Sequence, residues 1–243
     1  MIAALVVACA VAGLVAGWFL PPVIVRVPRK LPVRGAVEGL VDGLTDEPVT
    51  PGSLPVPSTT QRALLALLTG GLFAGMGARF DDSWALPAYL ALTAALVALS
   101  VIDLQHYLLP NRIVYPMTLA LLVLFTLAAA LDDDWGALGR GVSAGLIAFA
   151  AYFVLHLVSP RSMGFGDVKL SFGLGLALGW LGWGELLLGL FLGFFYGAVI
   201  GIVLMVVRRR NRKQAIPFGP FMAAGALTSI LVGAPVITWY QGG

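Results

Sequence analysis

The chain has 243 residues, of which 59% are hydrophobic and only 11% are charged. Soluble domains carry nearer a quarter charged residues, so this composition excludes a water-soluble globular protein and predicts a polytopic membrane protein. Basic loops beside membrane spans account for the net charge of +3, so we expect membrane lipid and no nucleic acid as a partner.

Eight apolar segments predict membrane-spanning helices, so the expected fold class is all-α with about eight transmembrane helices. They are residues 2–25, 62–78, 84–102, 112–131, 138–158, 168–181, 185–207 and 218–240. Segment 168–181 is short for a full crossing. Segment 2–25 could be a signal peptide, but its basic residues follow the apolar run, which favours a retained span with its N-terminus outside.

These segments divide the chain into three parts. Residues 1–25 form the first transmembrane helix, 26–61 a proline-rich loop, and 62–243 a seven-helix membrane domain. The loop is too rich in proline for long helices and too poor in apolar residues for a core of its own. It contains no cysteine, because the single cysteine is Cys9 in the first apolar run, so no four-cysteine zinc site is expected.

The basic residues support this topology. With the N-terminus outside, the loops at 26–62, 103–112, 159–169 and 208–213 face the cytoplasm. They hold 13 of the 15 basic residues: Arg26, Arg29, Lys30, Arg34, Arg62, Arg112, Arg161, Lys169, Arg208, Arg209, Arg210, Arg212 and Lys213. An excess of lysine and arginine in cytoplasmic loops is typical of membrane proteins. Asp103 and Asp167 then lie on the same membrane face.

Asp103 and Asp167 are the acids that loop solvation does not explain, because both stand at the ends of predicted helices. Carboxylates near the membrane need a partner or a function. The alternative is that both are solvated helix-terminal acids, with Asp167 at an N-cap or in a first turn. If the two meet, they share a proton, and the pair can activate water while polarising a peptide carbonyl.

Glycines accompany this chemistry. Gly164 and Gly166 precede Asp167, where they would let a substrate backbone pass closely and would allow unusual φ values. Gly189, Gly193, Gly197 and Gly201 recur every fourth residue, which favours close helix packing.

Other chemistries lack support in the sequence. His106 and His156 fit no His-Glu-x-x-His pattern, although His106 lies near Asp103. Neither a Gly-x-Ser-x-Gly turn nor a phosphate-binding loop is present.

Three stretches resemble the type IV prepilin peptidases, which are membrane aspartic proteases of the Gly-x-Gly-Asp class. They are Ile102-Asp103 with Leu109-Pro110-Asn111, then Gly164-Phe165-Gly166-Asp167-Val168-Lys169-Leu170, and Ile216-Pro217-Phe218-Gly219-Pro220-Phe221. The resemblance covers about 62–240 well and the first span more loosely. It makes 62–243 the peptidase domain, with Asp103 and Asp167 as the catalytic pair and Gly164, Gly166, Lys169, Pro110 and Asn111 supporting the motifs.

The resemblance also implies a substrate and a location. The expected substrates are prepilin or pseudopilin precursors, with a short basic leader before a hydrophobic helix. The expected reaction removes that leader on the cytoplasmic side of the cell inner membrane. No metal or cofactor is expected for it. Lys169 can equally be a cytoplasmic positive charge with no further role.

One departure from the family pattern concerns the 26–61 loop. Many members carry two Cys-x-x-Cys pairs that bind zinc there, and they also N-methylate the new N-terminus. This chain lacks those cysteines, so methylation is left open, and S-adenosylmethionine is expected only if methylation is retained.

Two other functions are weighed against this one. A transporter or channel would place acids near span centres and show inverted repeats, whereas these acids stand at span ends. A non-catalytic assembly component of a pilus or secretion system would not require both aspartates.

Overall fold

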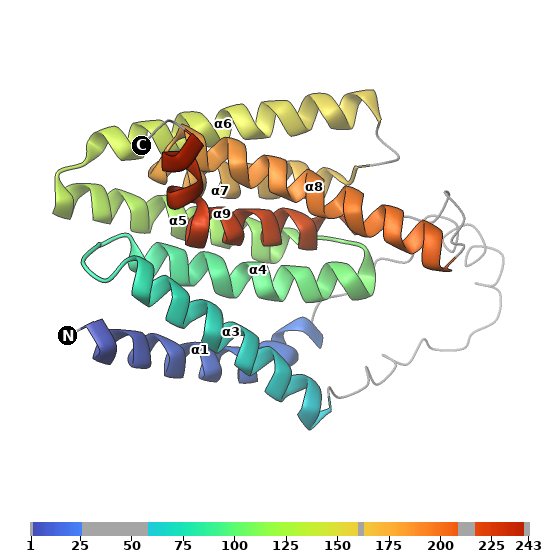
Figure 1. The fold of residues 1–243 in the computed structure, drawn as a ribbon, viewed down its shortest axis with the longest axis horizontal. Helices are drawn as coiled ribbons and strands as arrows, with labels where there is room; N and C mark the ends of the chain where they lie inside the picture. The colour runs from blue at the N-terminus through green and yellow to red at the C-terminus, as the bar shows by residue number, and fades with distance from the viewer. Residues whose placement is uncertain (1, 26–57, 160–162, 209–216, 241–243) are drawn as a thin grey trace, which may run out of the picture.

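The computed structural model describes residues 2–25, 58–159, 163–208 and 217–240. These residues form α-helices and no strand, so the all-α prediction is confirmed for them (Figure 1). The helices are α1 (Ile2–Val25), α3 (Thr59–Arg79), α4 (Leu86–His106), α5 (Asn111–Asp132), α6 (Trp135–Val158), α7 (Phe165–Leu181), α8 (Trp183–Arg208) and α9 (Gly219–Tyr240). The predicted loop at 26–61 lies outside the described residues as far as position 57.

Successive helices run in opposite directions through one bundle (Figure 1). Helices α1, α4, α6 and α8 therefore finish at the end of the bundle where α3, α5, α7 and α9 begin. We call this the aspartate end, because Asp103 lies in the last turn of α4 and Asp167 in the first turn of α7. The alternation places the two acids on one side of the bundle, as the span count predicts.

Six of the eight described helices are long and apolar enough to cross a membrane. They are Ile2–Leu20, Leu86–His106, Asn111–Asp132, Trp135–Val158, Trp183–Val206 and Gly219–Tyr240. Helix α7 does not qualify because it has 17 residues, and α3 begins with a polar turn and contains four glycines. The prediction of about eight spanning helices thus agrees with eight helices, of which α3 and α7 reach the bundle without the length or hydropathy of a typical span.

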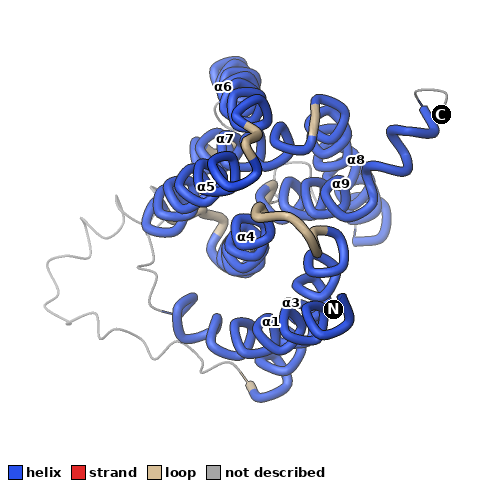
Figure 2. Tube along the Cα trace, turned by 90° about the vertical axis from the view of Figure 1, so that its left-hand side faces the viewer, coloured by secondary structure: helices blue, strands red, loops and turns tan. Residues whose placement is uncertain are grey.

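Helix α7 is enclosed by α5, α6, α8 and α9, and 12 of its 17 residues are buried (Figure 2). Side chains from other helices bind the C-terminal part of α7, away from Asp167. The Tyr89 hydroxyl donates to the Ala177 carbonyl at 2.8 Å, and Arg140 donates to the Gly179 and Trp180 carbonyls at 2.9 and 2.7 Å. The Arg140 bonds satisfy two carbonyls that the helix terminus leaves without intrahelical partners, and the Tyr89 bond adds a second donor to a carbonyl within the helix. The helix that carries Asp167 is therefore fixed along its length.

Small residues let the helices approach closely. A Cβ atom added at Gly175 of α7 would lie 2.8 Å from the Ala144 carbonyl oxygen of α6. On α8, a Cβ added at Gly189 would lie 2.7 Å from Leu178 of α7, and one at Gly193 would meet Met222 of α9 at 3.4 Å. The contact at Gly193 is an ordinary one, but a Cβ added at Gly225 of α9 would lie 2.6 Å from the Gly189 carbonyl oxygen, so the predicted close packing is confirmed at Gly189.

Local sequence signals set several helix starts. The Ser58 hydroxyl accepts from the Gln61 N–H at 3.2 Å, and the Gln61 side chain accepts from the Ser58 N–H at 3.1 Å, which is a capping box. Asp134 caps α6 by accepting from the Ala137 N–H at 2.9 Å. These caps satisfy backbone donors at both ends of the bundle.

Candidate active site

Asp103 lies in the last turn of α4 with 5% of its surface exposed. Its backbone carbonyl accepts from the N–H of Tyr107, which takes a left-handed conformation (φ 54°) and ends the helix. Its side-chain Oδ2 accepts a hydrogen bond from the Gly219 N–H at 3.0 Å. Gly219 is the first residue of α9, so this hydrogen bond joins the end of α4 to the start of α9, 116 positions further along the chain.

Asp167 is the third residue of α7 and is 7% exposed. Gly164 occupies the N-cap position, where it offers no side-chain hydrogen bond to the helix. The carboxylate lies beside the N-cap residue, where an atom at the Cβ position of Gly164 would be 3.4 Å from its Oδ2, and the Gly164 N–H favours its ionised form. The expected first-turn position of Asp167 is therefore observed, but the side chain is buried and not solvated.

The two carboxylates are close enough to influence each other's ionisation. Burial and then the charge of Asp103 raise the pKa of Asp167 from 3.8 to about 7, while the hydrogen bond from the Gly164 backbone acts in the opposite direction. Burial penalises the charged form, and a neighbouring negative charge penalises it again. At neutral pH this pair can therefore hold one proton between two carboxyl groups.

Leu109 joins the two motifs at the aspartate end. A Cβ atom added at Gly166 would lie 2.9 Å from the Leu109 Cβ, and one added at Gly219 would lie 3.2 Å from the Leu109 Cδ2. The absence of a side chain at Gly166 thus makes room for Leu109, and the passage of a substrate backbone beside Gly166 stays a prediction. Gly164 is exposed and has an ordinary φ of −69°, so the expected unusual φ is not used there.

A family model described as the type IV leader peptidase family matches residues 90–205, a range that includes Asp103 and Asp167. A prepilin leader peptidase/N-methyltransferase of Bacillus subtilis is 32% identical over 177 residues, which are 72% of this chain and 67% of that protein. The chain belongs to the type IV leader peptidase family.

Two other relatives in this family carry the same name. The protein of Stutzerimonas stutzeri is 36% identical over 75% of this chain and 63% of its own length. The protein of Aeromonas hydrophila is 33% identical over 76% of this chain and 62% of its own length. The chain therefore spans less than two thirds of the length of these two curated relatives. No solved structure matches the chain significantly.

In this member of the family, Lys169 links the starts of α7 and α5. Its Nζ donates to the Asn111 Oδ1 at 3.0 Å and lies 5.2 Å from the centre of the Tyr115 ring and 4.8 Å from that of Phe165. Pro110 occupies the N-cap position of α5, directly before Asn111. The motif residues Lys169 and Asn111 thus form a contact between α7 and α5.

Two residues that the sequence analysis left without a role lie behind the second aspartate motif. The Nδ1 atom of His156 is 2.8 Å from the Met163 carbonyl oxygen, directly before Gly164. Tyr152 stands one turn earlier on α6 and is 2% exposed, and the charge of Asp167 acts on it. Their spacing of four places both on one face of α6, which is the signal that could have linked them.

His106, by contrast, takes no part in the hydrogen bonds or ring contacts found among the described residues, although it follows Asp103 by three positions. Proximity in sequence is therefore not sufficient to bring a side chain into this site.

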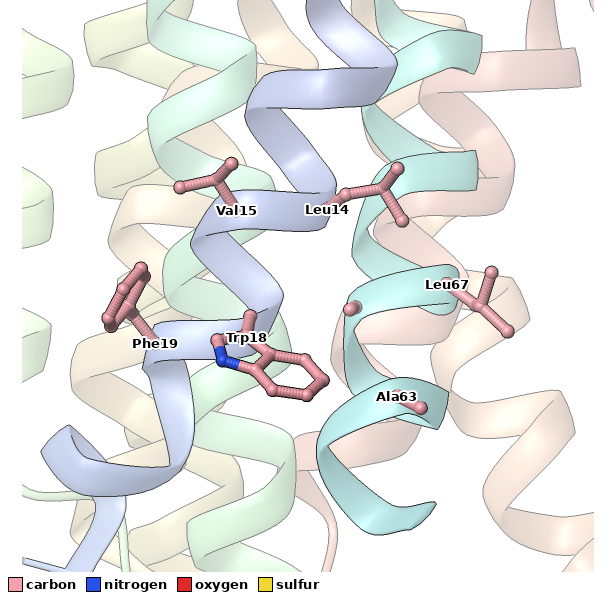
Figure 3. Close-up of a pocket in the computed structure, with 7 residues that line it drawn as sticks. Leu14, Val15, Trp18, Phe19, Ala63 and Leu67 are labelled. Carbon is pink, nitrogen blue, oxygen red and sulfur yellow. The ribbon is translucent and has the colours of Figure 1, made fainter. Parts of the chain in front are cut away.

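An apolar groove of about 460 Å³ lies between α1 and α3, apart from the aspartate pair (Figure 3). Its lining consists of Leu14, Val15, Trp18, Phe19, Ala63, Ala66 and Leu67. None of these side chains titrates, so the groove offers no acid or base for catalysis. The candidate active site is the aspartate end.

Proposed function

We propose that this chain is an aspartic endopeptidase that removes the leader from type IV prepilin-like precursors. The observation that carries the proposal is the pair of buried carboxylates, Asp103 and Asp167, which interact electrostatically where α4 ends and α7 begins. The relatives named as prepilin leader peptidases support the choice of reaction and substrate.

The pair carries out direct attack by water. Asp103, as the ionised member, takes a proton from water, and the oxygen attacks the scissile carbonyl carbon. Asp167 holds the shared proton at neutral pH and donates it to the carbonyl oxygen. Collapse of the tetrahedral intermediate breaks the C–N bond: the proton held on Asp103 passes to the leaving amine, and one hydroxyl of the intermediate returns its proton to Asp167 as the C=O bond re-forms. Neither a covalent intermediate nor a metal or cofactor is required for these steps.

The location of the pair suits a substrate with a basic leader before an apolar helix. Both carboxylates stand at helix ends, so the leader–helix junction can reach them while the apolar helix lies in lipid. The excess of basic residues in the loops of this end favours the cytoplasmic side of the inner membrane. The substrate's own basic leader would then stay on the side where it is synthesised.

Methylation of the new N-terminus is a separate step that the relatives' names include. The chain has no cysteine pair with which to build the zinc site that many members carry. We therefore propose the peptidase reaction alone, with S-adenosylmethionine required only if methylation is retained. Mass spectrometry of the processed N-terminus, with and without added S-adenosylmethionine, distinguishes a free amine from a methylated one.

The decisive test is cleavage of a prepilin leader fused to a reporter, in membranes that contain the wild type, Asp103→Asn or Asp167→Asn. Each substitution keeps the shape of the side chain and removes the acid, so cleavage should fall at least about a hundredfold. Asp133→Asn is the matched control, because this exposed aspartate lies at the opposite end of the bundle. If either motif variant is inserted and still cleaves at the wild-type rate, the proposed mechanism is wrong.

A further inference from the structure

His156 forms a contact that the proposed reaction does not use. It lies in the last turn of α6, and its Nδ1 is 2.8 Å from the carbonyl oxygen of Met163. Its ring centre is 5.5 Å from that of Phe165, the first residue of α7. The imidazole of His156 thus contacts the residues on both sides of the α7 N-cap, Met163 by a hydrogen bond and Phe165 by ring packing.

The partner of Nδ1 determines which nitrogen carries the proton. A backbone carbonyl oxygen accepts hydrogen bonds and cannot donate them. His156 must therefore carry a proton on Nδ1 and donate it to the Met163 carbonyl.

The Met163 carbonyl and the Gly164 N–H belong to the same peptide group. One side of this group accepts from His156, and the other interacts with the Asp167 carboxylate, three positions further along. An atom at the Cβ position of Gly164 would lie 3.4 Å from the Asp167 Oδ2, which shows how near the N-cap backbone is to this carboxylate. The helix start is also closed by the Asp167 N–H, which donates to the Gly164 carbonyl at 3.1 Å.

A hydrogen bond accepted by a peptide carbonyl polarises that peptide and strengthens the bond that its N–H donates. We propose that His156 is a positioning residue that acts on Asp167 through the Met163–Gly164 peptide, by orienting this peptide and strengthening its interaction with the carboxylate. That Asp167 then serves in peptide cleavage rests on the proposed function, whereas the connection itself does not.

Other groups near Asp167 need to be kept constant in a test. The charge of Asp103 from α4 acts on Asp167, and Asp167 in turn acts on Tyr152 from α6. On α7 itself, Lys169 is engaged by Asn111 and two aromatic rings. Replacing Asp103 by Asn removes the coupled titration and leaves Asp167 as the one carboxyl group of the pair.

The first experiment is an infrared titration of the Asp167 carboxyl group in the purified Asp103→Asn protein. The Asp103→Asn/Asp167→Asn double variant supplies the reference spectrum. Adding His156→Ala should raise the titration midpoint by at least about half a pH unit, because the N–H that favours the ionised form is no longer held. Adding His156→Asn should restore most of the shift, because the Asn amide can replace the Nδ1 donor.

His106→Asn is the matched control, since this other histidine makes no such contact among the described residues. An unchanged midpoint in the folded His156→Ala protein, or equal shifts for His156→Ala and His156→Asn, would overturn the inference.

The second experiment measures leader cleavage across pH in the protein with both aspartates. His156→Ala should lower kcat about tenfold with little change in KM and should move the alkaline limb of the profile upward, and His156→Asn should reverse both effects. Absence of cleavage by the wild type would contradict the proposed function and leave the infrared result to decide the role of His156. Normal cleavage by His156→Ala, with an unshifted profile, would contradict that role.

Discussion

The Asp103 carboxylate depends on a backbone donor from a distant part of the chain. Its Oδ2 accepts from the Gly219 N–H, and the absence of a side chain at Gly219 lets the backbone of α9 come this close. The identity of residue 219 therefore controls where one member of the pair sits.

Replacing Gly219 by Ala tests this contact. A Cβ there would lie 2.7 Å from the Asp103 Oδ2, so the carboxylate or the start of α9 must shift. Since small displacements of a catalytic group are costly, we expect leader cleavage to fall about 10- to 100-fold. Gly139→Ala is the control, because a Cβ at this exposed position of α6 meets nothing within 4 Å. Equal rates for the two variants would show that Gly219 does not position Asp103.

The proton on Asp167 makes the reaction depend on pH. Burial and the charge of Asp103 raise the pKa of this group to about 7, so its acid form is lost as the pH rises through that value. We expect cleavage to decline above about pH 7, because both carboxyl groups are then ionised, and to decline again in acid, when the pair has no base. A profile that stays flat between about pH 6 and about pH 9, a range that includes the expected change, would contradict a shared proton.

The titration of Asp167 should also make the stability of the folded protein depend on pH. Between about pH 4 and pH 7 the folded protein holds a proton on Asp167 that the unfolded chain releases, so stability falls as the pH rises through this window. Asp103 is buried as well, so the comparison is made in an Asp103→Asn background, where the further Asp167→Asn change removes the dependence. The difference between the two melting curves, measured across pH in detergent, isolates it.

Among the helices, α7 carries Asp167 and is bound by other helices near both ends. Tyr89 and Arg140 bind its last carbonyls, and Lys169 ties its first turn to α5. Its short length is compatible with this position because its neighbours cover 12 of its 17 residues.

Lys169→Gln tests the tie between α7 and α5. It removes the ammonium group from the Tyr115 and Phe165 rings and weakens the bond to Asn111, which should lower stability by about 1–2 kcal/mol. Thermal unfolding in detergent measures the loss, and Lys169→Arg should recover part of it, because a guanidinium also binds rings and amide oxygens. Arg112→Gln, at an exposed position in the first turn of α5, is the control for loss of a charge alone. Similar melting temperatures for the Lys169→Gln protein and this control would show that the tie is not stabilising.

In the whole molecule, alternating helix directions bring the two motifs to one end, and the basic loops predict that this end faces the cytoplasm (Figure 1). The opposite end carries Asp133 in the α5–α6 connection.

Single cysteines in a Cys9→Ser background test this orientation. Gln105→Cys lies at the aspartate end and Asp133→Cys at the opposite end, and both positions are exposed. In intact cells, an impermeant thiol reagent should label Asp133→Cys and spare Gln105→Cys until the membrane is opened. Labelling of Gln105→Cys alone in intact cells would reverse the proposed orientation.

The helix count, the membrane class and the side of the bundle that holds both aspartates follow from local patterns. Long apolar runs have few alternatives in lipid, where every backbone group must be bonded within the helix, and an odd or even number of spans decides which loops share a face. Caps such as Ser58 and Asp134 are also local, because donor and acceptor stand three residues apart.

The contacts that make a site of the two motifs depend on tertiary packing. Gly219 lies 116 positions from Asp103, and Leu109 lies directly beside Gly166. His156 reaches the second motif only because α6 ends where α7 begins. Spacing along the chain shows which residues can share a helix face. Side-chain packing between the helices decides which of these faces meet. It thereby also decides which carboxyl group is buried and keeps its proton.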